Sequence, residues 1–477
     1  MDKDLRSIQQ ARDMVLLAGE AANAVSEFTQ EQVDAIVRAM SEKGFAHAEE
    51  LARMAVEESG MGKYEDKIIK NRFASRNLYE YIKDMKTVGI VKEDEEKGLW
   101  EIAIPAGVVV ALIPTTNPTS TAIYKCMICM KARNPVILSP HPSAKKAIAR
   151  ACELMSEAAM AHGAPKNMFQ CLTEVHMAGT HELMHNDGVA LILATGGRDM
   201  VRAAYSAGRP ALGVGPGNVP AFIERSADIR SAVSKIVSSK TFDNGVICAS
   251  EQSVVTENCI AEAVAEEMKR QGCYFLSDEE AAKVARIMTR GPGKLNPGIV
   301  GHTAREIAAM AGISVPDSVL VLVYREKGVG ANYPFSIEKL SPILAFYSEE
   351  DWHSACLLCI ELLNYNGVGH SLAIHSENRD IIREFALKKP VSRILVNTPT
   401  SQGAIGASTF LAPALTLGCG TVGGSATSDN VTPMHLINIR RVAYGRKEAA
   451  AENKSLDPSG ADLEAITRKV IEILKNT

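Results

Sequence analysis

Cys248 is the residue whose type and surroundings most favour chemistry. It lies in a stretch of small and polar residues, Phe242-Asp-Asn-Gly-Val-Ile-Cys-Ala-Ser-Glu-Gln, that leads into an apolar run at 253–255. In such a loop a thiol is accessible, and backbone N–H groups can stabilise the thiolate that acts as a nucleophile. The local sequence alone leaves open the alternative of one more small core cysteine.

Two other loops could support a reaction at this thiol. Asn117 lies between Thr116 and Pro118, directly after an apolar run, and its amide could donate to a developing oxyanion. An ordinary Asn-Pro turn is the alternative. The stretch Thr195-Gly196-Gly197 follows another apolar run and opens a helical pattern, an arrangement whose backbone amides suit a pyrophosphate. Because it is not the G-x-G-x-x-G fingerprint, a tight strand-to-helix turn remains equally compatible with it.

Strands and helices alternate through residues 108–206, and this alternation would position both loops. The predicted strands are 108–113, 136–139, 168–172 and 189–194, and the predicted helices are 119–130, 143–161, 181–184 and 198–206. Such alternation predicts a parallel sheet covered on both faces, a doubly wound α/β domain that binds ligands beyond the carboxyl ends of its strands. A second α/β region is predicted from about 241 to 429.

The two ends of the chain have different patterns. Residues 1–86 show helical periodicity, and residues 87–92 and 99–104 flank a polar turn and predict a β-hairpin. Residues 455–460 resemble a linker, and 462–476 predict a helix with one apolar stripe. The stripe consists of Leu463, Ile466, Val470, Ile473 and Leu474.

Composition narrows the class of protein. Among 477 residues, 46% are hydrophobic and 23% are charged, and the net charge of -4 calls for neither nucleic acid nor an anionic membrane. The N-terminus has no signal-peptide core, and the most apolar stretch, 107–113, is too short to span a bilayer. Ten cysteines lie mostly in apolar segments, which indicates reduced thiols and a cytoplasmic location.

Two pairs of cysteines have the C-x-x-C spacing of some metal sites, Cys126 with Cys129 and Cys356 with Cys359. Both pairs lie in apolar helical segments without nearby histidine clusters or turn glycines, so we expect core residues and no metal.

Seven segments in this order resemble the aldehyde dehydrogenase superfamily, and specifically its CoA-acylating branch. That branch includes the aldehyde half of the bifunctional aldehyde–alcohol dehydrogenases and the enzymes of ethanolamine and propanediol microcompartments. The resemblance covers about residues 5–445. Its segments are 113–121, 139–142, 193–197, 213–218, 241–252, 338–342 and 367–370.

The resemblance implies a role for each candidate residue. Cys248 matches the nucleophile, Asn117 the oxyanion-hole amide, and His370 a histidine near the acylating site that contacts CoA or relays a proton. By local sequence alone, a lone histidine in a glycine-rich stretch such as 367–370 is about as often structural. The cofactor would be NAD, with NADP as an alternative, and CoA would be the co-substrate. The matching cofactor residues are Thr195, Gly196 and Gly197 for the pyrophosphate, Ser139, Pro140, His141 and Pro142 for the adenosine rim, and Glu338 for the nicotinamide ribose. By local sequence alone, Glu338 would be a surface ion pair with Lys339.

The resemblance also implies an organisation. It assigns 1–86 and 105–240 to a Rossmann-type cofactor domain and 241–430 to an α/β catalytic domain. Residues 87–104 and 431–447 would be oligomerisation arms of a homodimer or tetramer. Residues 448–477 would be a linker and an amphipathic helix that resembles the peptides directing enzymes into bacterial microcompartments, with packing on its own subunit as the alternative.

One departure from the superfamily indicates the acyl acceptor. Hydrolytic members carry a glutamate that activates water, and Val214 falls where that glutamate should be. A valine cannot act as a general base, so we expect the acyl group to pass to CoA. We also expect a neutral aldehyde, acetaldehyde or propionaldehyde, because 114–122 and 397–410 contain no Lys or Arg. Sulfoacetaldehyde or succinic semialdehyde would need a cation such as Arg393 or Lys125 to reach the pocket.

Overall fold

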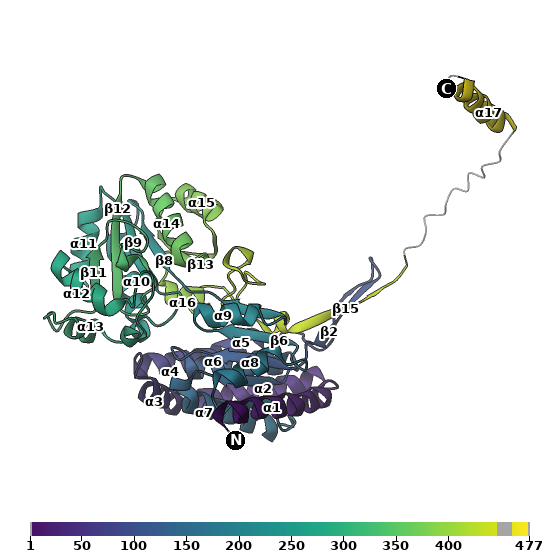
Figure 1. Ribbon diagram of the computed structural model, residues 1–477, viewed down its shortest axis with the longest axis horizontal. Helices are drawn as coiled ribbons and strands as arrows, with labels where there is room; N and C mark the ends of the chain where they lie inside the picture. The colour runs from purple at the N-terminus through teal and green to yellow at the C-terminus, as the bar shows by residue number, and fades with distance from the viewer. Residues whose placement is uncertain (1, 446–459, 476–477) are drawn as a thin grey trace. The chain divides into compact units, whose positions relative to one another are not determined.

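The computed structural model of the chain describes residues 2–445 and 460–475. Backbone contacts divide the chain into two units, each described by itself below. The larger comprises Met1–Gly89 and Ala103–Asn438, and the smaller comprises Ile90–Ile102 and Ile439–Thr477. The larger unit contains a five-stranded and a seven-stranded sheet (Figure 1).

The five-stranded sheet has the order β5-β4-β3-β6-β7, and every neighbouring pair of strands is parallel. In the central register, Val109 of β3 lies opposite Val136 of β4 and Leu191 of β6. The predicted doubly wound fold is confirmed. The strands are β3 (Val109–Ile113), β4 (Val136–Pro140), β5 (Phe169–Cys171), β6 (Leu191–Thr195) and β7 (Ala211–Val214).

Successive side chains of a strand point to opposite faces of the sheet. Both faces of this sheet are apolar, so helices cover both of them. Val109 and Ile113 of β3 belong to one apolar core, whereas Val110 and Leu112 belong to another. The first core includes side chains from α2 (Gln30–Ala46), α6 (Pro118–Lys131) and α7 (Lys145–Ala161), and the second includes side chains from α1 (Lys3–Val25), α8 (Met177–His185) and α9 (Arg198–Tyr205).

A helical segment with an irregular turn completes this part of the unit. The helix α3 (Ala48–Ser59) precedes α4 (Tyr64–Arg72), which continues through a π-helical turn (Phe73–Asn77) into α5 (Leu78–Ile82). Two lysines of α4, Lys67 and Lys70, are spaced three residues apart and are almost fully buried. Residues at this spacing lie on the same face of a helix, so both ammonium groups point into the protein.

The seven-stranded sheet has the order β10-β11-β12-β9-β8-β13-β14, and its neighbouring strands are also parallel. Its strands are β8 (Val219–Ile223), β9 (Glu251–Glu257), β10 (Cys273–Phe275), β11 (Val321–Arg325), β12 (Ile343–Glu349), β13 (Gly369–His375) and β14 (Val391–Val396). Its helices are α10 (Ile229–Thr241), α11 (Ala261–Arg270), α12 (Asp278–Met288), α13 (Ala304–Met310), α14 (Trp352–Asn366), α15 (Arg379–Lys388) and α16 (Thr400–Ala404).

The predicted domain boundary at residue 240 needs correction. β8 pairs with β9 and β13, and α10 packs against the same sheet, so residues 219–240 belong with the second sheet. The chain therefore changes sheets between β7 and β8, about twenty residues earlier than predicted. Since parallel strands need long crossovers, β8 and β9 are separated by α10 and by the loop that carries Cys248.

The smaller unit contains a three-stranded sheet, in the order β1 (Gly89–Asp94), β2 (Leu99–Pro105) and β15 (Ile437–Ala443), and the helix α17 (Gly460–Lys475). Trp100 and Tyr444 meet edge to face with their ring centroids 5.6 Å apart, and Arg441 pairs with Glu101. Residues 455–459 of the predicted linker lie outside the described residues, and Gly460 begins α17. Among the helices described, none is long and apolar enough to cross a membrane.

Candidate active site

The Cys248 loop is held in an uncommon backbone conformation. Between α10 and β9, three successive residues, Asp243, Asn244 and Gly245, have φ values of 49°, 53° and 73°. Asp and Asn tolerate this left-handed region better than most side chains, and surrounding contacts must maintain it. Here the Asn244 amide donates to the carbonyl oxygen of Gly301 at 2.8 Å, and the Asp243 carboxylate accepts the backbone N–H of Lys63 at 2.7 Å.

His370 contacts the half-buried thiol directly. Its Nε2 lies 3.2 Å from Cys248 Sγ, and its Nδ1 lies 3.1 Å from Ser371 Oγ. The histidine is fully buried at the start of β13, directly after Gly369, which has a φ of 84°. A Cβ on Gly369 would lie 2.0 Å from the carbonyl oxygen of Cys419, so the strand can begin here only with glycine.

Burial keeps this pair of side chains neutral. It raises the pKa of the Cys248 thiol to about 12, and the charge of Glu338 acts in the same direction. Burial also lowers the pKa of His370 to about 3, assisted by the charge of Arg393. The favoured form is therefore a thiol that donates to Nε2 of a neutral imidazole, with the ring proton on Nδ1.

Asn117 ends the loop after β3 and is the N-cap residue of α6. Its Oδ1 accepts a hydrogen bond from Lys70 Nζ at 2.6 Å, and its Nδ2 donates to Thr116 Oγ1 at 3.1 Å. Asn117 and the Cys248 loop are connected because Lys70 also pairs with Asp243. Asn117 is recognisable as a candidate in the sequence, whereas this buried connection through Lys70 is not.

The predicted cofactor loops lie at one edge of the five-stranded sheet. Residues 114–117, 140–142 and 195–197 follow β3, β4 and β6, which are neighbouring parallel strands, so the three loops share the carboxyl edge. Gly197 is the N-cap of α9 and provides no capping side chain, and a Cβ there would meet open space. The first N–H groups of α9 therefore suit a phosphate.

The other residues of these loops have local partners. Ser139 Oγ lies 2.9 Å from Thr180 Oγ1, His141 Nδ1 accepts from the backbone N–H of Ser143, and Thr195 Oγ1 lies 3.3 Å from Thr416 Oγ1. These contacts hold the three side chains in place at this edge of the sheet.

Glu338 lies close to Cys248 and does not form a surface ion pair with Lys339. Its Oε1 accepts from the backbone N–H of Gly217 at 2.8 Å, and burial raises its pKa to about 7. Lys339 is fully buried and donates instead to the carbonyl oxygens of Phe335 and Ile337. A Cβ on Gly217 would lie 1.8 Å from the carbonyl oxygen of Cys248, so Glu338 and the cysteine loop meet across this glycine.

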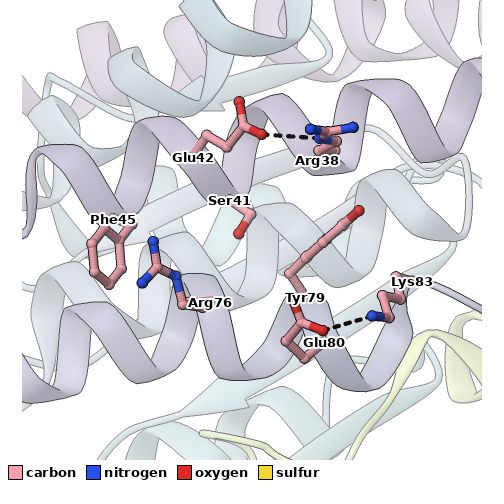
Figure 2. Close-up of a pocket in the computed structure, with 8 residues that line it drawn as sticks. All are labelled: Arg38, Ser41, Glu42, Phe45, Arg76, Tyr79, Glu80 and Lys83. Carbon is pink, nitrogen blue, oxygen red and sulfur yellow. Dashed lines mark hydrogen bonds and ion pairs between the residues drawn. The ribbon is translucent and has the colours of Figure 1, made fainter.

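Cys126, Cys129, Cys356 and Cys359 are buried in apolar cores, as predicted. Within residues 2–445 and 460–475 no cluster of His, Cys, Asp and Glu could hold a metal ion. Figure 2 shows a surface pocket between α2 and the segment from the π-helical turn to α5, with ion pairs between Arg38 and Glu42 and between Lys83 and Glu80. None of the candidate site residues lines it.

Comparisons with known proteins identify the family of the chain. A family model described as the aldehyde dehydrogenase family matches residues 5–272, and the chain belongs to this family. It is 46% identical over 429 residues to the bifunctional aldehyde-alcohol dehydrogenase AdhE of Escherichia coli strain K12, covering 89% of this chain and 48% of that protein. The chain thus spans about half the length of the bifunctional relatives it matches.

Two solved structures are similar over nearly their whole length. An acetylating aldehyde dehydrogenase from Geobacillus thermoglucosidasius is 51% identical with a TM-score of 0.92, covering 94% of this chain and 99% of that one. A propionaldehyde dehydrogenase from the fucose utilisation microcompartment of Clostridium phytofermentans is 30% identical with a TM-score of 0.82, covering 91% and 97%.

The neutral thiol–imidazole pair predicts a particular pH dependence for alkylation by iodoacetamide. Because the pKa of Cys248 is raised, the thiolate fraction should grow about tenfold per pH unit from neutral pH to roughly pH 9. Peptide mapping would follow Cys248 alone, with Cys248→Ala as the blank, since Cys259 is exposed. A rate that is already constant near neutral pH would instead show a thiolate–imidazolium pair.

Glycine at position 217 is expected to be essential for the cysteine loop. Gly217→Ala should lower the turnover of aldehyde oxidation about a hundredfold, because the added methyl group must displace the Cys248 backbone, and misplacements of about 1 Å have such effects. Gly19→Ala is the matched control, since a Cβ there meets nothing within 4 Å. Normal turnover in Gly217→Ala would contradict this geometry.

Proposed function

We propose that the protein is a CoA-acylating aldehyde dehydrogenase that converts acetaldehyde or propionaldehyde, CoA and NAD reversibly to acyl-CoA and NADH. The contact between His370 Nε2 and Cys248 Sγ, 3.2 Å long, is the observation that carries this proposal. Membership of the aldehyde dehydrogenase family and similarity to an acetylating aldehyde dehydrogenase and a propionaldehyde dehydrogenase support it.

The first step is the addition of the Cys248 sulfur to the aldehyde carbon. The thiol proton moves toward His370 Nε2 as the carbon–sulfur bond forms, because the thiol already faces this acceptor. A neutral imidazole with a low pKa holds the proton weakly, so it can return it in the reverse reaction.

The oxyanion that forms would be stabilised by the Asn117 amide and the backbone N–H of Cys248. Each such donor is worth roughly 3–4 kcal/mol in comparable sites. Residues 195–197 would hold the pyrophosphate, 139–142 the adenosine and Glu338 the ribose of the nicotinamide cofactor. When bound, this cofactor would accept the hydride from the adduct. Loss of the hydride converts the adduct into a thioester on Cys248.

Transfer of the acyl group to CoA follows from the groups around the thioester. The segment Gly213-Val-Gly-Pro-Gly-Asn contains no acidic side chain, and Val214 is buried. Once His370 has released the first proton to solvent, its Nε2 is placed to accept the proton of the incoming CoA thiol and to return it to the departing Cys248 sulfur. Water lacks a dedicated base at the aligned position, so CoA is the favoured acceptor.

The environment of the buried cations supports a neutral aldehyde. Arg393 donates to the carbonyl oxygens of His370 and Gly418, and Lys125 Nζ donates to those of Leu112 and Leu193. Both groups thus already donate to carbonyl oxygens of the protein. An anionic substrate such as sulfoacetaldehyde or succinic semialdehyde would need a cation that is free to bind it.

The direct test measures NADH formation from acetaldehyde and from propionaldehyde, with and without CoA. We expect turnover that depends strictly on CoA and is abolished in Cys248→Ala, with the anionic aldehydes at least about tenfold poorer because binding them lacks a charge-assisted hydrogen bond. Replacing NAD by NADP under the same conditions tests the cofactor preference.

Each other outcome identifies an alternative. Turnover without CoA would show a hydrolytic aldehyde dehydrogenase and overturn the inference from Val214. Activity confined to an anionic aldehyde would overturn the choice of substrate. No turnover with any of these aldehydes would favour a binding or scaffold protein that retains the fold.

We further propose a homodimer or tetramer formed through the three-stranded sheet and a microcompartment shell protein as the partner of α17. Most of the β1, β2 and β15 side chains are exposed or half-buried. On α17, Leu463, Ile466 and Val470 are 62%, 64% and 49% exposed and are spaced three or four residues apart. This is the spacing of helix-in-groove binding. Such a partner would place this otherwise cytoplasmic enzyme inside a microcompartment.

Deleting residues 455–477 tests the role of the helix. We expect the truncated protein to lose co-sedimentation with shell proteins while its turnover of aldehyde stays normal. Replacing Leu463 and Ile466 by glutamate in the full chain should have the same effect, because it interrupts the apolar stripe but keeps the length of the chain. Unchanged co-sedimentation of both variants would exclude this docking role.

A further inference from the structure

We infer that Lys70 is a positioning residue that fixes the orientation of the Asn117 amide and strengthens it as a hydrogen-bond donor. This inference rests on the proposed role of Asn117 at the oxyanion. Lys70 Nζ lies 2.6 Å from Asn117 Oδ1. An ammonium group can only donate, so it selects the oxygen of the amide and turns Nδ2 away. One Nδ2–H reaches Thr116 Oγ1, and the other remains for a substrate.

A buried carboxylate keeps Lys70 in this place. Asp243 Oδ2 pairs with Lys70 and with Lys67, the latter at 3.0 Å, and the three side chains are between 0% and 2% exposed. Burial lowers the pKa of Lys70 to about 8, whereas the charge of Asp243 acts in the opposite direction. Lys70 is therefore an ammonium group at neutral pH.

The same carboxylate links the amide to the nucleophile. Asp243 precedes Cys248 by five residues, and its left-handed backbone is held by Lys63 and by Asp66, whose carboxylate accepts the Asp243 N–H at 2.7 Å. Lys67 also donates to the carbonyl oxygen of Thr116, next to Asn117. The helix α4 thus connects the loop after β3 with the cysteine loop. One ion cluster therefore fixes the positions of both the Asn117 amide and the Cys248 loop.

The positive charge also has an electronic effect. A cation on the amide oxygen draws electron density from nitrogen, and the Nδ2–H becomes a stronger donor to an oxyanion. Hydrogen bonds that involve a charged group have roughly twice the strength of neutral ones. Losing both the orientation and the polarisation should lower the rate of Cys248 acylation by about ten- to a hundredfold.

The experiment measures acylation of Cys248 by p-nitrophenyl acetate, from the burst of p-nitrophenolate, in the full chain. This reaction forms an oxyanion but needs neither CoA nor a nicotinamide cofactor, so it is independent of the substrate assignment. The variants are Lys70→Met, Asn117→Ala and the double variant. We expect a ten- to hundredfold slower burst for Lys70→Met, a comparable or larger loss for Asn117→Ala, and no additional loss in the double variant.

Three controls separate positioning from folding. Lys131→Met removes another fully buried, ion-paired lysine, which bonds to Asp34 and to the carbonyl oxygen of Lys83, and it should leave the burst unchanged. Alkylation of Cys248 by iodoacetamide, which forms no oxyanion, should be normal in Lys70→Met. Lys70→Gln keeps a neutral donor, so its burst rate should lie between those of the unchanged protein and Lys70→Met. If Lys70→Met fails to fold, the burst rate of Lys70→Gln tests the role of Lys70.

The outcomes distinguish this inference from the proposed function. Additive losses in the double variant, or a normal burst in both Lys70 variants, would overturn the role of Lys70 while Asn117→Ala still shows an oxyanion donor. A normal burst in Asn117→Ala would instead remove the oxyanion role of Asn117, and with it the inference for Lys70.

Discussion

The carboxylate of Asp243 faces two ammonium groups, Lys67 and Lys70, in a region that water does not reach. Transfer of any one of these charges into the interior costs several kcal/mol, about as much as the whole stability of many domains, unless a partner is present. Each group therefore requires the others, and the helix α4, the loop after β3 and the cysteine loop are constrained together. Replacing a buried ion cluster by well-packed apolar residues is often neutral or stabilising, so we attribute the role of this cluster to the geometry that it imposes.

That geometry surrounds the thiol that we propose as the nucleophile, which is not ionised at rest. The thiol of Cys248 and the imidazole of His370 share one hydrogen bond, and burial disfavours a charge on either of them. In the reaction that we propose, negative charge develops only when the sulfur adds to an aldehyde, and it develops on the substrate oxygen, near the proposed donors. Such a site stabilises the transition state more than the ground state, which is the condition for an increase in turnover.

The elements around β3 could be predicted because a short apolar run bounded by glycine and proline favours a buried strand. The run Val109–Ile113 is bounded by Gly107 and Pro114, and its alternate side chains enter two different cores. The boundary at residue 240 was wrong because β8 is a short strand that contains Pro220 and directly follows a glycine-rich loop. Periodicity carries no information about which of two sheets such a strand joins.

The chemistry was only partly visible in the sequence. Cys248 and Asn117 lie in loops of recognisable composition, whereas α4, with the sequence Tyr-Glu-Asp-Lys-Ile-Ile-Lys-Asn-Arg, reads as a polar surface helix. Lysines are rarely buried, so nothing local distinguishes Lys70 from an exposed lysine. The one available signal was the polar Asp243-Asn244 pair before an otherwise apolar cysteine segment.

The central claim is that Cys248 carries the acyl group between CoA and the aldehyde. The most direct measurement is intact-protein mass spectrometry followed by peptide mapping, after incubation with propionyl-CoA in the absence of NADH. The account predicts a propionyl adduct on the peptide that contains Cys248, removed by added free CoA and absent from Cys248→Ala. An unmodified Cys248, or an adduct that free CoA cannot remove, would contradict it.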